Sequence, residues 1–217
     1  ALLVFDEVMT SRLAPGGLQT RFGIKPDLMT LGKYVAGGMS FGAFGGCADL
    51  MRRFDPREPG ALGHAGTFNN NVLTMSAGIA AMTKVVTQEA LDAVNARGEA
   101  LRQRLQALCL EHRAPVCVTG IGSLFTIHGT EGPVRSNADI TGQDQRIKEL
   151  MFFDLQEQGI YLARRGMAAL SFEIGDDACS AFVAAFEQFL KRRAPLFATD
   201  ASSVVVQKFS SPSPRVR

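Results

Sequence analysis

Two side chains near the start of the chain have types and positions suited to carbonyl chemistry. Asp6 follows the apolar run 1–5, and Lys33 follows the apolar segment 27–31 and Gly32. Both runs are typical of strands in a parallel sheet, where ligand sites lie at the carboxyl ends of the strands. We expect the first run to be a buried, central strand. A lysine in apolar, glycine-rich surroundings loses hydration, which favours the neutral amine that attacks carbonyl carbon.

Each of these residues also has an ordinary structural explanation. An aspartate at a strand end can cap a helix or form an ion pair, because an isolated buried carboxylate is costly. A lysine at a turn is usually a solvated surface residue. Taken singly, Asp6 and Lys33 therefore do not decide between a catalytic and a structural role.

Four runs of residues, in a fixed order, are together more specific. They are Leu-Val-Phe-Asp-Glu-Val-Met-Thr at 3–10, Lys-Pro-Asp-Leu-Met-Thr-Leu-Gly-Lys at 25–33, Gly-Gly-Met with Gly-Ala-Phe-Gly-Gly within 37–46, and Ala-Gly-Thr-Phe at 65–68. This set resembles the class III aminotransferase family of fold-type-I pyridoxal-phosphate (PLP) enzymes. Asp-Glu-Val-Met-Thr and Gly-Ala-Phe-Gly-Gly are most similar to the glutamate-1-semialdehyde 2,1-aminomutase branch. The resemblance extends from residue 1 to about residue 195.

The resemblance implies a role for each of four residues. Asp6 matches the aspartate that pairs with the pyridine nitrogen of PLP and keeps it protonated. Val8 matches the aliphatic residue that packs on one face of the ring. Lys33 matches the lysine that binds PLP as a Schiff base and then shuttles a proton. Thr67 matches the threonine that binds the PLP phosphate of the neighbouring subunit, which implies a homodimer.

The implied function is PLP-dependent amino-group transfer on an amino acid or amino aldehyde, as in an aminotransferase or the aminomutase. Family members are much longer than 217 residues. Their first half supplies the loop that grips the phosphate and an aromatic residue on the other ring face. A truncated, catalytically incomplete fragment of the same family is therefore an alternative. The run Met-Thr-Ser-Arg at 9–12 also departs from the usual Gly-Phe-Arg continuation, which leaves substrate selection there open.

Hydrophobic periodicity and the resemblance together predict an α/β chain. Its parts are the end of a fold-type-I PLP-binding large domain (1–86), a linking helix (87–114), a small C-terminal α+β domain (115–197) and a disordered tail (198–217). The expected elements are helices at 72–86, 87–112, 143–158 and from 176 or 177 onward, with strands at 116–128, 160–163 and 168–174.

Composition and charge argue against several partner classes. The net charge is +2 and the basic residues are scattered, so we expect neither nucleic acid nor an anionic membrane as a partner. No run approaches the ~20 apolar residues that span a bilayer, and we expect a cytoplasmic protein. The cysteines are expected to be buried and reduced rather than metal-binding, because they form no Cys-x-x-Cys pair. They are Cys47, Cys109, Cys117 and Cys179.

Three further residues have two open interpretations. His64, close before Thr67, either faces the phosphate or is a solvated loop histidine. Arg164 and Arg165, in the small domain, either meet a substrate carboxylate or form a solvated basic pair.

Overall fold

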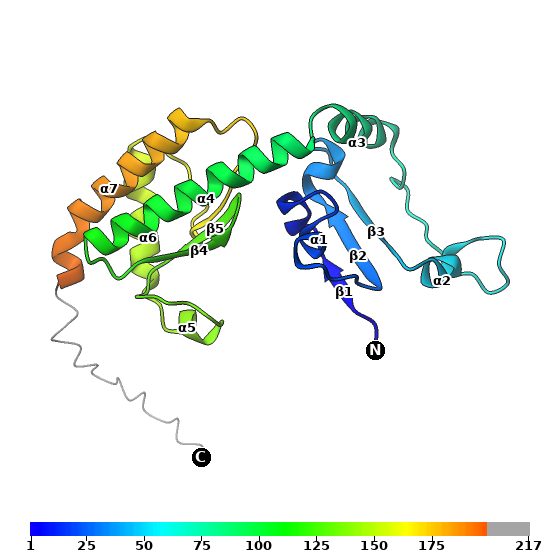
Figure 1. The fold of residues 1–217 in the computed structure, drawn as a ribbon, viewed down its shortest axis with the longest axis horizontal. Helices are drawn as coiled ribbons and strands as arrows, with labels where there is room; N and C mark the ends of the chain where they lie inside the picture. The colour runs from blue at the N-terminus through cyan, green and yellow to red at the C-terminus, as the bar shows by residue number, and fades with distance from the viewer. Residues whose placement is uncertain (199–217) are drawn as a thin grey trace, which may run out of the picture.

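The structure, a computed structural model, contains two three-stranded sheets connected by one long helix (Figure 1). It describes residues 1–198, so the tail expected at 198–217 lies outside the described part, except for the last residue of helix α7 (Asp176–Ala198). Within residues 1–198, no helix is long and apolar enough to cross a membrane.

The N-terminal sheet has the order β1-β2-β3, with β1 at Val4–Asp6, β2 at Leu28–Gly32 and β3 at Gly42–Gly46. β1 and β2 run parallel, as the sequence predicts, and β3 is antiparallel to β2. The expectation that β1 is a buried central strand is wrong for this chain. β1 is an edge strand and Val4 is 54% exposed, because no other described segment pairs with its outer edge.

Short helical turns connect these strands and lead away from the sheet. They are η1 (Thr10–Leu13), α1 (Leu18–Phe22), η2 (Lys33–Ala36), α2 (Ala48–Met51) and η3 (Arg52–Phe54). The glycines within 37–46 allow segments of the backbone to approach each other closely. At Gly46, for example, a Cβ would lie 2.1 Å from the carbonyl oxygen of Asp27 on the way into β2.

Polar caps begin the two helices that follow, and both helices start where the sequence predicts. The Asn71 side chain accepts hydrogen bonds from two backbone amides in the first turn of α3 (Val72–Lys84). Thr87 accepts one from the Ala90 amide at the start of α4 (Gln88–Glu111). These side-chain oxygens satisfy N–H groups that have no partner inside the helix. α4 then extends from the end of α3 to the C-terminal sheet (Figure 1).

The C-terminal sheet is an antiparallel meander of three strands, β4 (Cys117–Ile121), β5 (Leu124–His128) and β6 (Met167–Ala169). The single strand predicted at 116–128 is wrong, because Gly122 (φ 55°) turns the chain and makes a hairpin. The strand predicted at 168–174 is reduced to β6, and that at 160–163 is coil. Leu162 is nevertheless buried, so burial alone produced the apolar pattern there.

Helices α4, α6 and α7 and the C-terminal sheet enclose the main hydrophobic core. α6 (Gln145–Glu157) begins after its cap Asp144 and ends before Gly159, close to the predicted bounds, while α5 (Ala138–Thr141) lies in the preceding loop. The most deeply buried core residues are Leu105, Leu108, Ile127, Met151, Leu155, Phe186, Phe189 and Leu190. In the first 86 residues, by contrast, the buried apolar side chains are Leu13 and Ala36.

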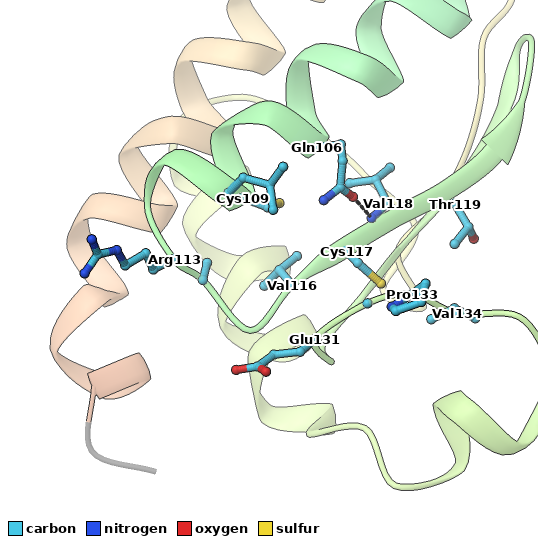
Figure 2. Close-up of a pocket in the computed structure, with 13 residues that line it drawn as sticks. Gln106, Cys109, Arg113, Val116, Cys117, Val118, Thr119, Glu131, Pro133 and Val134 are labelled. Carbon is cyan, nitrogen blue, oxygen red and sulfur yellow. Dashed lines mark hydrogen bonds between the residues drawn. The ribbon is translucent and has the colours of Figure 1, made fainter. Parts of the chain in front are cut away.

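A surface hollow of about 630 Å³ lies between the end of α4, strand β4 and the segment 131–134 (Figure 2). Two buried thiols line it, Cys109 from α4 and Cys117 from β4. Burial raises the pKa of Cys109 to about 12, and the nearby Cys117 thiol adds to the shift. The expectation of buried cysteines is confirmed for these two and is wrong for Cys47, which lies at the exposed entrance of α2.

The uneven distribution of the core predicts uneven resistance to proteolysis. In limited trypsin digestion of the 217-residue chain, we expect the first cuts in the exposed segment 52–71. A fragment that begins near α4 should persist longest, because it contains the main core. Peptide mapping by mass spectrometry identifies the cuts. Equal persistence of both halves would contradict this view.

The thiol environments predict a fixed order of modification. With Ellman's reagent at pH 8, we expect Cys47 to react first and Cys109 to react only after denaturation, since the thiolate is the reactive form. Cys47→Ser should remove the fast phase and leave the slow phase unchanged. Modification of Cys109 as fast as Cys47 in the native chain would show that the hollow opens readily.

Candidate functional site

The parallel pairing of β1 with β2 determines the position of Asp6. Asp6 is opposite Thr30 in the ladder, and its Oδ1 accepts a hydrogen bond of 3.0 Å from the Thr30 hydroxyl. The same oxygen accepts one of 3.1 Å from the Val8 amide. Within residues 1–198, Oδ2 has no hydrogen-bond partner, and the Asp6 residue is exposed. The carboxylate is therefore held through one oxygen while the other remains available.

Val8 and Lys33 lie at the same end of these two strands. A Cβ built on Gly32, the last residue of β2, would be only 3.3 Å from Val8 Cγ1. The Val8 side chain therefore packs against the backbone that leads directly into Lys33. The lack of a side chain at Gly32 is what allows this contact.

Lys33 has an unusual backbone conformation. Its φ is 56°, in the left-handed region, which costs a residue other than glycine about 1–3 kcal/mol and recurs at functional sites. Lys33 is exposed to solvent, and its amine makes no hydrogen bond or ion pair to residues 1–198. The expected loss of hydration is therefore not provided by the described part of the chain.

Helix α3 supports the turn that contains Lys33. A Cβ on Gly78 of α3 would lie 3.0 Å from the carbonyl oxygen of Val35, and one on Gly37 would lie 2.7 Å from that of Ala77. These glycines let α3 and η2 touch backbone to backbone, so the turn after Lys33 rests on a regular helix.

Thr67 is not brought to the other three residues within this chain. It is exposed, in the turn that precedes α3, and makes no hydrogen bond with Asp6, Val8 or Lys33. In Figure 1 the segment between α2 and α3 leaves the N-terminal sheet and runs along its outer side.

The sequence reasoning missed Glu7, which is only 1% exposed. Its carboxylate accepts hydrogen bonds from the Thr10 hydroxyl and, at 2.8 Å, from the Gln19 amide. A Cβ on Gly17 would lie 2.7 Å from Glu7 Oε1, so the Pro-Gly-Gly turn is shaped around this acid. Glu7 thereby anchors the loop that follows Asp6. The signal in the sequence was an acid next to Asp6 followed, within ten residues, by paired glycines.

The three ambiguous residues have structural contacts. His64 packs edge-on against the rings of Phe44 and Phe54, with centroids 5.3 and 6.3 Å away. Arg164 forms an ion pair of 3.1 Å with Glu149 and lies over the rings of Phe152 and Phe153. Arg165 donates a hydrogen bond of 3.4 Å to the sulfur of Met167.

Comparison with known proteins supports the resemblance. Residues 1–190 match the family Aminotransferase class-III. The chain is 55% identical over 190 residues to the beta-phenylalanine transaminase of Variovorax paradoxus, covering 88% of this chain and 44% of that protein. It is 43% identical over 164 residues to a glutamate-1-semialdehyde 2,1-aminomutase of Nitratidesulfovibrio vulgaris, covering 75% of this chain and 38% of that protein.

Solved structures give the same result for the fold. A beta-phenylalanine aminotransferase from V. paradoxus matches with a TM-score of 0.88 at 54% identity, over 90% of this chain and 45% of that one. An omega-transaminase from Sphaerobacter thermophilus matches with a TM-score of 0.78 at 36% identity, over 88% and 44%. The expected fold-type-I architecture is thereby confirmed for the part of those structures that this chain covers.

Two further conclusions follow from these figures. The chain spans less than half the length of the relatives that it matches. The expected placement nearest to the aminomutase branch is corrected, since identity to the transaminase is 55% against 43% to the aminomutase. With the family matched over 190 of 217 residues, this chain belongs to the class III aminotransferases.

Proposed function

We propose that the chain supplies the catalytic lysine side of a PLP site in an amino-group transferase. The observation that carries this proposal is the meeting of Asp6, Val8 and Lys33 at one end of two parallel strands. PLP, when bound, acts as an electron sink for negative charge on the substrate carbon.

Asp6 is suited to hold the protonated ring nitrogen of the cofactor. Its Oδ1 accepts hydrogen bonds from Thr30 and Val8, so the carboxylate cannot rotate freely. Its Oδ2 is available to accept a hydrogen bond from the protonated ring nitrogen. A fixed negative charge at this point keeps the nitrogen protonated at no cost of reorganisation. The Val8 side chain packs against Gly32, the residue before Lys33, and offers an aliphatic surface to a flat ring. The described residues therefore fit one side of PLP.

Lys33 would bind the cofactor covalently and afterwards move a proton at the substrate carbon. The left-handed backbone of Lys33 and the contacts of the following turn with α3 support this role, because they fix the point at which the side chain leaves the main chain. In the proposed homodimer, Thr67 would reach the cofactor phosphate of the neighbouring subunit, beside the N-terminus of α3, which favours anions. The exposure of Thr67 supports a role outside its own subunit.

For the substrate, we propose a β-amino acid of the kind named for the V. paradoxus relative. At 55% identity, that relative is more similar than the aminomutases, so we favour transfer between two molecules over an amino-group shift within one.

A second proposal concerns the isolated chain. The relatives have more than half of their length outside the matched region. We propose that residues 1–86 belong to a large domain, residues 115–197 form a small one, and the 217-residue chain alone is an incomplete, inactive fragment. The exposed apolar edge at β1, with Leu2, Leu3 and Val4 at least 45% exposed, supports this proposal.

Cofactor attachment tests the assignment of Lys33. In a cofactor-competent form, joined to the upstream half, we expect PLP and borohydride reduction to attach the cofactor to Lys33, as found by peptide mapping, because this lysine follows β2 beside Val8. Lys25→Arg, in the same region, should leave the label in place, whereas Lys33→Arg should abolish it. A label on another lysine with Lys33 unmodified would refute the assignment.

Asp6→Asn tests the partner of the ring nitrogen. In a version joined to the upstream half, with β-phenylalanine as donor, we expect turnover to fall by about a hundredfold or more while cofactor occupancy changes little. The asparagine keeps the shape and the Thr30 contact but removes the charge. Thr30→Val serves as the matched control, since it removes a contact to Asp6 and keeps the charge. Near-normal turnover in Asp6→Asn would count against this role.

A further inference from the structure

A group of polar contacts, the polar junction, joins the loop after β1 to α4 and to the C-terminal sheet. Asn95 of α4 is 9% exposed, and its Nδ2 donates a hydrogen bond of 3.1 Å to the Arg12 carbonyl oxygen in η1. Its Oδ1 accepts one of 2.9 Å from the Ser123 amide, in the turn between β4 and β5. One side-chain amide therefore binds the loop after β1 on one side and the C-terminal sheet on the other.

Two glycines bring these segments into backbone contact. A Cβ on Gly98 of α4 would lie 2.4 Å from the carbonyl oxygen of Gly122. A Cβ on Gly122, where φ is 55°, would lie 2.5 Å from Asn95 Oδ1. The helix and the hairpin turn can meet in this register only because both positions lack a side chain.

The Arg12 side chain makes a second link across the junction. Its guanidinium donates a hydrogen bond to the carbonyl oxygen of Leu170, just after β6. The Leu170 amide in turn donates to the Ser123 carbonyl oxygen at 2.9 Å. Among residues 1–198 no carboxylate pairs with Arg12, and burial lowers its pKa. The carbonyl oxygen of Leu170 is the acceptor for the guanidinium among residues 1–198, and the Arg12 Nε is buried there without a hydrogen-bond partner.

The junction is connected directly to the candidate site. Arg12 follows Asp6 by six residues, and the loop between them is anchored by the buried Glu7. The Ser11 amide donates a hydrogen bond of 3.1 Å to the Glu7 carbonyl oxygen, which extends the link from β1 to η1. A movement of the C-terminal sheet relative to α4 would thus be transmitted to the loop beside Asp6 and Val8.

We propose that Arg12 and Asn95 are positioning residues, which form a clasp that sets the C-terminal sheet against the loop next to the cofactor site. The proposal rests on the proposed function for its catalytic consequence, but the clasp itself is a property of the described chain. A buried amide leaves donors or acceptors unpaired in any other arrangement. Such a group therefore selects one orientation of the two sheets.

Amide hydrogen exchange in the 217-residue chain, without cofactor, tests the clasp. Asn95→Asp keeps the acceptor for Ser123 and replaces the donor to Arg12 by an oxygen that repels its carbonyl. Arg12→Met removes the guanidinium and its bond to Leu170 and keeps an unbranched apolar side chain. Arg104→Met is the matched control, since Arg104 is on α4 and, in the part of the chain that the structure describes, pairs only with Glu111 at the surface.

We expect each variant to speed exchange on the opposite side of the junction. Asn95→Asp should raise exchange rates in the loop 10–19 by about five- to tenfold, the effect of one buried hydrogen bond. Arg12→Met should do so at Leu170 and Ser123, and Arg104→Met should change neither region. Effects confined to the substituted side, or no protection of the loop 10–19 in the parent chain, would overturn the clasp. If Asn95→Asp does not fold, Arg12→Met decides the matter alone.

The catalytic consequence has a separate measurement. In a version joined to the upstream half, Arg12→Met should raise the KM for the amino donor several-fold and leave the absorbance of the bound cofactor unchanged. A failure of cofactor binding in the parent would refute the proposed function and leave the exchange result intact. An unchanged KM together with the cross-junction exchange effect would reduce the clasp to a structural contact and refute the positioning role.

Discussion

The parallel ladder between β1 and β2 determines where three of the candidate site residues, Asp6, Val8 and Lys33, lie. Parallel strands bring their carboxyl ends to the same edge of a sheet, so the residues that follow each strand meet there. Asp6 at the end of β1 and Lys33 directly after β2 are neighbours for this reason, although 26 residues separate them in the sequence. A shift of register by one residue would turn Asp6 to the other face of the sheet.

Around this ladder, small residues and one buried acid do most of the positioning. Gly32 admits the Val8 side chain beside the turn, and Gly78 of α3 lets a helix support η2. Glu7 is buried next to the exposed Asp6, so adjacent carboxylates have opposite tasks. Because successive residues of a strand point to opposite faces, one acid can organise the loop while the other faces the candidate site.

The two sheets differ in how far their apolar residues are buried. The C-terminal sheet is enclosed by α4, α6 and α7 around a continuous core, and such a unit is stabilised by its own apolar burial. The N-terminal sheet exposes apolar residues at β1, and Lys33, directly after β2, is exposed as well. Within residues 1–198 the arrangement is therefore that of an acid held through one oxygen and an exposed lysine at the same end of two strands.

From the sequence alone, local signals were sufficient for much of this protein. The helices expected to begin at 72 and 87 and the helix expected to end at 158 have nearly these bounds in the structure. Helix ends depend on the preferences of a few neighbouring residues, such as the caps Asn71 and Thr87, and not on distant contacts. Tertiary structure decided what depends on partners across the fold. It split the apolar run 116–128 at Gly122, placed the coil residue Leu162 in the core, and buried Glu7 rather than Asp6. Burial and pairing are set by which segments meet in space, and an apolar run reads the same in a strand, a turn or a packed coil.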